Sequence, residues 1–240
     1  MRKICFITFG GPVTSYHSAV DNICKQAKDF EIFNEINGYT EKNLKDDSYF
    51  WNNHGDFIKN NSRGYGYWIW KPYLIQQKLN KLNYGDILVY TDAGCEINPK
   101  GKQRFYEYID MIDKDPKQYG LLTFQTPHLE KYYSKLAIFD WFKIDDEEIK
   151  NSGQCVGSIQ IIKKTEHSLN VINKWVENMH YELINDNLFN EILGFKDNRH
   201  DQSIYSILVK KYGSIKIPDE TWYNNWDDGN FIPFLAKRNK

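Results

Sequence analysis

Short apolar runs alternate with amphipathic stretches along most of the chain. The apolar runs are rich in β-branched and aromatic residues, and glycine, proline or asparagine bounds several of them, which is typical of buried strands. We expect strands at residues 3–9, 30–36, 87–94, 120–126, 150–163 and 214–218. Apolar residues at helical spacing predict helices at residues 18–29, 67–82, 99–113, 168–184 and 201–211. We interpret residues 37–62 as loop and short helix, and the chain from residue 220 onward as an ordered loop.

Strands that alternate with helices favour an α/β fold, in which a mostly parallel central sheet carries helices on both faces. The 240 residues contain no internal repeat, no low-complexity tract and no proline- or serine-rich linker. A chain of this length is sufficient for one sizeable hydrophobic core. We therefore predict a single domain over residues 1–240.

The composition narrows the range of partners. The formal net charge is −1, so no overall field attracts nucleic acid or an anionic membrane, and we expect no nucleic-acid partner. Aromatic residues make up 16% of the chain, which is more than a core needs. Some of them are core packing, and others can form flat platforms for sugar rings or a nucleobase.

The sequence carries no pattern of export or membrane insertion. Residues 3–9 are too short for the apolar part of a signal peptide, and no stretch approaches the roughly 20 apolar residues of a membrane span. The four cysteines lack the spacing of a metal site, and we expect reduced thiols. These features predict a cytoplasmic protein without a transmembrane segment.

An acid ends the apolar run at residues 87–91, in the segment GDILVYTDAG. Ligands of open α/β sheets bind outside the carboxyl ends of the strands, so Asp92 is placed to meet a ligand or a cation. Gly94 permits close approach of a ligand to the backbone. The alternative is that Asp92 only caps a following helix.

Two further segments combine groups that suit an anionic ligand or acid–base chemistry. RGYGYWIWKP (63–72) contains two glycines, four aromatic residues and the cations Arg63 and Lys71, which suit a phosphate; the alternative is an aromatic core cluster with Arg63 in solvent. DNRHDQS (197–203) places the base His200, the carboxylate of Asp201 and the amide of Gln202 side by side. Here the alternative is that Asp201 is the N-cap of the next helix.

Taken in order, three motifs resemble GT-A glycosyltransferases, in particular poorly characterised bacterial and viral transferases that build glycans. They are RGYGYWIWKPYLI (63–75), GDILVYTDAGCEINP (85–99) and RHDQSIYSILVKKYG (199–213), and the resemblance covers roughly residues 1–220. It implies a Rossmann-like GT-A domain that transfers a hexose or deoxyhexose from a UDP- or GDP-linked donor to a glycan acceptor, as in polysaccharide biosynthesis. It also suggests that residues 220–240 are a C-terminal lid or tail.

The resemblance also assigns residues to the site. Asp92 and Asp201 are the implied catalytic residues. The implied donor-binding residues are Thr8, Phe9, Gly10, Tyr16, Arg63, Tyr67, Trp70, Lys71, Asp92, Ala93 and Gly94. The residues implied to contact the acceptor or the transferred sugar are Gln154, His200, Gln202 and Trp222. Asp201 takes the acceptor proton if the reaction inverts the anomeric centre, or stabilises positive charge there if the reaction retains it.

The motif at Asp92 departs from the D-x-D pattern of the family, because Gly94 stands where the second acid is expected. Mn²⁺ or Mg²⁺, bound by Asp92, is still the expected cofactor, since a nucleoside diphosphate leaving group needs its charge neutralised. The alternative is neutralisation by protein cations, with Lys71 and Arg63 as the candidates.

Two other functions are compatible with parts of the sequence. The aromatic residues alone would suit a non-catalytic carbohydrate-binding protein, although such a protein needs no acid at a strand end. Asp92 and Asp201 could also form the carboxylate pair of a glycoside hydrolase, but this leaves the segment from Arg63 to Lys71 unexplained.

Overall fold

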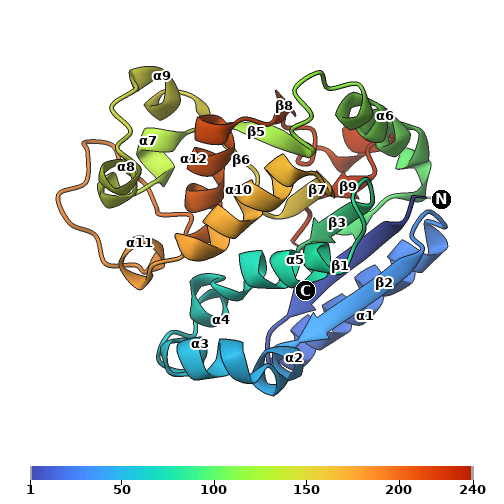
Figure 1. Ribbon diagram of the computed structural model, residues 1–240, viewed down its shortest axis with the longest axis horizontal. Helices are drawn as coiled ribbons and strands as arrows, with labels where there is room; N and C mark the ends of the chain where they lie inside the picture. Colours follow the sequence, from blue (N-terminus) through green and yellow to red (C-terminus); the bar gives the residue numbers. More distant parts are fainter. Residues whose placement is uncertain (1, 239–240) are drawn as a thin grey trace.

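A mixed sheet of seven strands runs through the centre of the molecule, with helices on both faces (Figure 1). The structure is a computed structural model and describes residues 2–238. The strands of this sheet are β1 (Ile4–Gly10), β2 (Glu35–Thr40), β3 (Ile87–Thr91), β5 (Leu121–Leu129), β6 (Gly153–Cys155), β7 (Ile159–Lys163) and β8 (Ile215–Pro218). A separate two-stranded sheet pairs β4 (Glu96–Ile97) with β9 (Phe234–Leu235).

The helices follow the strands in alternation over much of the chain. The longer ones are α1 (Thr14–Asp29), α3 (Ser48–Asn60), α5 (Trp70–Asn80), α6 (Lys102–Asp113), α10 (Glu166–Glu177) and α12 (Asp201–Tyr212). The shorter ones are α2 (Glu41–Asp46), α4 (Gly64–Tyr67), α7 (Glu130–Tyr133), α8 (Leu136–Phe142), α9 (Glu147–Lys150) and α11 (Tyr181–Ile184). Two 3-10 turns cover Pro99–Gly101 and Trp226–Gly229. No helix within residues 2–238 is both long and apolar enough to cross a membrane.

The strand order is β2-β1-β3-β7-β5-β6, and β8 lies beside β5. β1 is parallel to β2 and β3, and β8 is parallel to β5. β7 runs antiparallel to both β3 and β5, and β6 runs antiparallel to β5. All strands except β6 and β7 therefore point the same way, and the prediction of an α/β fold with a mostly parallel sheet is confirmed.

Strand β3 shows how the sheet separates two hydrophobic cores. Successive side chains of a strand point to opposite faces. Leu88 and Tyr90 pack into the core beneath α5, α10 and α12, whereas Ile87 and Val89 pack into the core beneath α1 and α6. The same alternation directs Asp92, two residues after Tyr90, toward the face that α5 and α12 cover.

Several boundaries differ from the predicted ones. The strand predicted at residues 30–36 is wrong, because α1 extends to Asp29, Phe30 closes its last turn in the core, and β2 starts only at Glu35. Residues 37–62 are largely ordered as the end of β2 followed by α2 and α3. The segment 150–163 forms two strands rather than one, and the helix predicted at 168–184 stops at Glu177.

The C-terminal segment packs against the body of the protein through β9. Leu235 lies opposite Glu96, and Phe234 lies opposite Ile97. Phe234 is fully buried among side chains of the second core. Of the segment predicted as a lid or tail, residues 239–240 lie outside the described part, as does residue 1 of the predicted domain.

Candidate functional site

Asp92 stands at the carboxyl end of β3, where the chain leaves the sheet. Its backbone N–H donates to the Ser158 carbonyl at 2.8 Å, and its own carbonyl accepts from the Cys95 N–H at 2.9 Å. A tight turn to β4 follows, so Asp92 does not cap a helix. The Tyr90 hydroxyl donates to Asp92 Oδ1 at 2.6 Å and fixes the carboxylate. The Asp92 side chain is still 34% exposed, which leaves it open to a ligand.

Lys71 brings the three sequence motifs together. It lies in the first turn of α5 and is only 3% exposed. Its Nζ lies 3.2 Å from Asp92 Oδ1 and 2.8 Å from Asp201 Oδ2. The same ammonium lies 5.6 Å from the centre of the Tyr90 ring. A buried lysine is stable only when it is paired, and here two carboxylates from different elements provide the pairing.

Asp201 is the first residue of α12, and His200 precedes it as the N-cap. The alternative that Asp201 is the N-cap is therefore wrong. Its side chain is 5% exposed and is directed at Lys71. The indole N–H of Trp175, from α10, donates to the Asp201 carbonyl at 3.1 Å and anchors this end of α12.

Burial and charge set the protonation of this cluster. Burial raises the pKa of Asp201 to about 6, although the neighbouring Lys71 ammonium lowers it. For Lys71, burial opposes the charged form, but the charges of Asp201 and Asp92 outweigh it and raise its pKa. Burial, followed by the charge of Asp92, raises the pKa of Tyr90 well above its usual range. Lys71 thus stays an ammonium and Tyr90 stays a hydrogen-bond donor, while Asp201 titrates within reach of neutral pH.

Two glutamine amides hold the start of α12 against the loop between β6 and β7. Gln202 Oε1 accepts from the Gly157 N–H at 2.9 Å, and its Nε2 donates to Gln154 Oε1 at 2.7 Å. Gln154 is fully buried, and its own amide donates to Ser134, Ser203 and the Tyr133 carbonyl. The structure thus places Gln154 behind Gln202, where it positions the site and is shielded from an acceptor.

At the end of β1, most of the residues expected to bind the donor are packed into the protein. Thr8, Phe9 and Trp70 are buried, and the Phe9 and Trp70 rings lie 3.9 Å apart. The Trp70 indole N–H donates to the Gly64 carbonyl at 3.0 Å. A Cβ at Gly10 would lie 2.6 Å from the Tyr16 carbonyl, so only glycine lets α1 approach here. Tyr16 itself is 40% exposed.

Arg63, Tyr67 and His200 form a neighbouring cluster rather than part of the Lys71 group. Arg63 pairs with Asp186 at 2.7 Å and with Asp197 at 3.2 Å. The His200 ring is buried, stacks on Tyr67 with ring centres 5.1 Å apart, and contacts the Ile184 carbonyl through Nδ1 at 2.6 Å. Burial lowers the pKa of His200, so the imidazole is neutral at pH 7.

The remaining predicted residues lie in the turn after Asp92 and in the C-terminal segment. Ala93 is buried against Ala19 and Val20 of α1, and Gly94 is half-buried in the turn that follows Asp92. Trp222 is 52% exposed, with its ring centre 6.1 Å from that of Trp226. Trp222 is therefore available to a ligand, but no contact links it to Lys71 or Asp92 in the residues 2–238.

The residues around Asp92 do not fit a divalent cation. Within residues 2–238, no three His, Cys, Asp or Glu side chains are grouped so that they could hold a metal ion. Asp92 Oδ1 is already bound by Tyr90 and Lys71, and Glu96 pairs with Lys237 at 2.9 Å. At nucleotide sites Mg²⁺ and Mn²⁺ take one or two carboxylates and complete their shell with water and phosphate oxygens. Here the carboxylate of Asp92 already has the Lys71 ammonium 3.2 Å from Oδ1, and that ammonium repels a dication.

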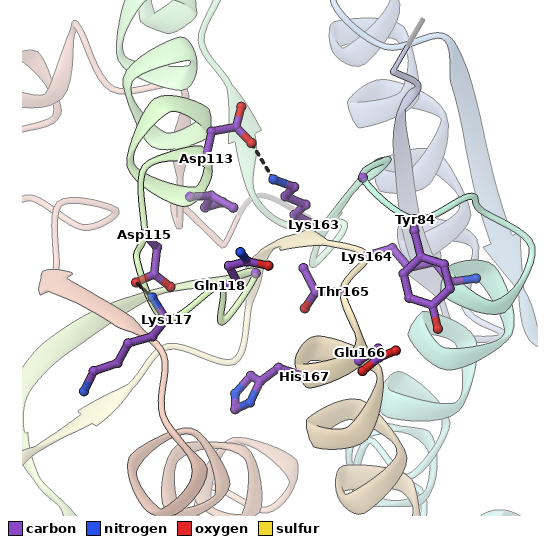
Figure 2. A pocket seen from close by; sticks show the side chains of 13 residues that line it. Tyr84, Asp113, Asp115, Lys117, Gln118, Lys163, Lys164, Thr165, Glu166 and His167 are labelled. Carbon is purple, nitrogen blue, oxygen red and sulfur yellow. Dashed lines mark hydrogen bonds and ion pairs between the residues drawn. The ribbon is translucent and has the colours of Figure 1, made fainter.

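A cavity of about 680 Å³ lies at the other end of β3, next to Gly85. Figure 2 shows Tyr84 and Lys164 on one side of it and Asp113, paired with Lys163 at 2.8 Å, on another. His167, from the first turn of α10, and its N-cap Thr165 also line the cavity. Lys71, Asp92 and Asp201 do not border this cavity. We place the candidate site at Asp92 instead, because these three residues meet there and the Asp92 carboxylate is partly exposed.

The similarity of this chain to known proteins lies in its structure and not in its sequence. No protein-family model and no curated protein matches the sequence. Among solved structures, the chain is similar to a glycosyltransferase involved in the glycosylation of the major capsid of PBCV-1. The two chains are 12% identical, the alignment covers 97% of this chain and 93% of the other, and the TM-score is 0.50. A mouse xyloside xylosyltransferase 1 in its apo form is similar at 8% identity, with 98% and 97% of the two chains covered and a TM-score of 0.49.

The likeness to the first of these structures extends over nearly the whole of both chains. The chain thus has the fold of a glycosyltransferase of the GT-A type, as its sequence motifs predicted. At 12% identity the likeness concerns the fold alone, and the activity has to be argued from the residues of the site.

Proposed function

We propose that the protein transfers a sugar, a hexose or deoxyhexose, from a UDP- or GDP-linked donor to a hydroxyl of a glycan, as a cytoplasmic step of polysaccharide synthesis. The observation that carries the proposal is the ion-pair cluster in which Lys71 joins Asp92, at the end of β3, to Asp201, at the start of α12. A ligand held at the carboxyl ends of β1 and β3 meets this cluster.

The two acids have environments that suit different roles. Asp92 is one-third exposed and held by the Tyr90 hydroxyl, so it faces the donor as a fixed carboxylate. Asp201 has a pKa raised to about 6, which suits a general base near neutral pH. The acceptor oxygen bonds to the anomeric carbon, its proton passes to Asp201, and the bond to the nucleoside diphosphate breaks. Lys71 orients both carboxylates.

The same cluster argues against the glycoside hydrolase alternative. A hydrolase needs one protonated and one ionised carboxyl group on either side of a glycosidic bond. The Lys71 ammonium contacts both Asp92 and Asp201 and takes the space between them, so the two carboxyl groups do not stand free on either side of a glycosidic bond. A non-catalytic sugar-binding protein would not need a buried cluster of this kind.

The proposal predicts that nucleoside diphosphates stabilise the protein, because a ligand that binds only the native state raises its stability by mass action. We expect UDP or GDP, at about 100 times its Kd, to add about 2.7 kcal/mol to the free energy of unfolding. The measurement is a melting curve with each nucleotide, paired with an assay for slow hydrolysis of UDP- and GDP-sugars. If no nucleotide shifts the melting temperature and no nucleotide sugar is hydrolysed, the proposed function is wrong.

The pH dependence tests the role of Asp201. As a base, its carboxylate must be ionised, and its pKa of about 6 lies above the usual range for aspartate. We expect kcat/KM to be level above about pH 7 and to fall roughly tenfold per unit below pH 6. Nucleotide binding, measured over the same range, serves as the control. A rate that falls only below pH 4 would show that a carboxyl with an ordinary pKa, or none, limits the reaction.

A further inference from the structure

The candidate site carries more negative than positive charge. One ammonium, on Lys71, faces the two carboxylates of Asp92 and Asp201. A nucleoside diphosphate brings further negative charge to the same place, and repulsion would oppose its binding. The residues around Asp92 do not fit a divalent cation that could offset this charge. Other cations must therefore lie close to the end of β3 if a diphosphate is to bind there.

The two cations that the sequence offered for this role are already paired. Lys71 is buried between Asp92 and Asp201, so these two carboxylates already neutralise its charge. Arg63 forms ion pairs with Asp186 and Asp197. Lys237 is engaged as well, because its ammonium lies 2.9 Å from Glu96.

Arg199 stands two residues before Asp201 and has no such partner. Its guanidinium carbon lies over the Tyr133 ring, 4.1 Å from the ring centre. No carboxylate of residues 2–238 forms an ion pair with it, and its side chain makes none of the hydrogen bonds found in this part of the chain. An arginine stacked on an aromatic face keeps its edge N–H groups available for a phosphate.

Arg238 approaches the same place from the C-terminal segment. In the antiparallel ladder Leu235 lies opposite Glu96, so the chain after β9 runs back toward the turn at Asp92. Burial and Asp92 raise the pKa of Cys95, whereas the charges of Lys71 and Arg238 oppose this rise. Burial also lowers the pKa of Arg199, and Arg238 lowers it further. The register of β9 thus brings Arg238 toward the turn at Asp92, and no ion pair to another residue of the described chain engages it.

We propose that Arg199 and Arg238 bind the diphosphate of the donor and take the place of a divalent cation. The proposal rests on the proposed function and adds how the leaving group is held. Guanidinium groups present paired N–H donors that match two phosphate oxygens. The mutual repulsion of the two arginines is relieved when an anion lies between them, so binding also stabilises the C-terminal segment against the turn at Asp92.

The test is calorimetric titration of UDP and GDP, and of inorganic pyrophosphate as a probe without base or sugar, into the full chain in EDTA and in Mn²⁺. We expect wild-type affinity to be the same in both solutions. Arg199→Gln and Arg238→Gln should each weaken binding about tenfold to a hundredfold, the range of a charged hydrogen bond. Arg2→Gln is the matched control, because Arg2 pairs with Asp113 at the opposite end of β3 and should leave binding unchanged.

Two results would overturn the proposal. One is wild-type binding that requires Mn²⁺ and disappears in EDTA; the other is unchanged affinity in both arginine variants. In either case nucleotide still binds, so the proposed function stands and only the means of holding the diphosphate is wrong. If wild type binds no nucleotide in either solution, both proposals fail together. Arg238 is exposed and lies after the last strand, so its variant should melt with wild type and keep the test interpretable.

Discussion

Asp92→Asn is expected to reduce sugar transfer by roughly 10²–10³-fold while the protein remains folded, because it removes a fixed charge from the reacting centre. Asparagine keeps the shape of the side chain and can still accept from the Tyr90 hydroxyl. Lys71 keeps Asp201 as its partner at 2.8 Å, so no buried charge is left unpaired. The measurements are kcat/KM for transfer and the melting temperature of the same sample.

Asp113→Asn is the matched control for this variant. Asp113 is also an acid in a cluster of charges, paired with Arg2 and Lys163, but it lies by the cavity at the opposite end of β3. Its amide variant should keep normal turnover. An Asp92→Asn protein with normal turnover would remove Asp92 from the reacting centre, and with it the assignment of this end of the sheet as the site.

The sequence predicts the strands and long helices well where one pattern dominates. β1 and α12 are largely apolar and lie within one residue of their predicted bounds. β3 begins at Ile87 as predicted, but it leaves the sheet at Thr91, three residues before the predicted end. The strand predicted at residues 30–36 failed because Phe30 and Phe33 pack into the core from the end of α1 and the turn after it, which alternation alone cannot distinguish from a strand. Burial in a turn leaves the same apolar pattern as burial in a strand.

The segment RGYGYW (63–68) shows a second limit of prediction from the sequence. Tyr65, Gly66, Tyr67 and Trp68 all have positive φ, so the chain turns sharply before α5 begins at Trp70. Glycines signal such a turn, but a left-handed conformation at three aromatic residues is costly and depends on the packing around them. The helix predicted from Tyr67 therefore starts late, and its register decides that Lys71 faces Asp92.

Motifs at the candidate site were visible in the sequence, but their pairing was not. Asp92, Lys71 and Asp201 stand out by residue type and position, yet only the fold shows that one ammonium contacts both acids. Conversely, Gln154 and Arg63 have the right chemistry but are committed to other protein groups. Arg199 and Arg238 were missed as site residues, because their availability depends on which acids lie near every other cation.

Asp201→Asn is expected to slow transfer by roughly 10²–10⁴-fold, the effect of losing a general base, while UDP or GDP still binds. The melting temperature should fall as well, because Lys71 loses its closer and buried partner at 2.8 Å and keeps only Asp92, which lies at 3.2 Å and is one-third exposed. Loss of stability therefore cannot separate a catalytic from a structural carboxylate, and two other measurements do so. The fall of kcat/KM below pH 6 should disappear in the variant, and formate should restore part of the activity of Asp201→Ala by occupying the vacated position.

Glu130→Gln is the control variant, because it shows the behaviour expected of Asp201→Asn if Asp201 has only a structural role. Glu130 is fully buried and paired with Lys210 at 2.7 Å, as Asp201 is with Lys71, but it lies in α7 and contacts none of the three cluster residues. Breaking a buried pair costs about 3–5 kcal/mol, so this variant should lose stability while its turnover and pH profile stay near those of wild type. If Asp201→Asn behaves in the same way, with an unchanged fall below pH 6 and no rescue by formate, Asp201 is a structural partner of Lys71. The base that accepts the acceptor proton would then be the exposed carboxylate of Asp92.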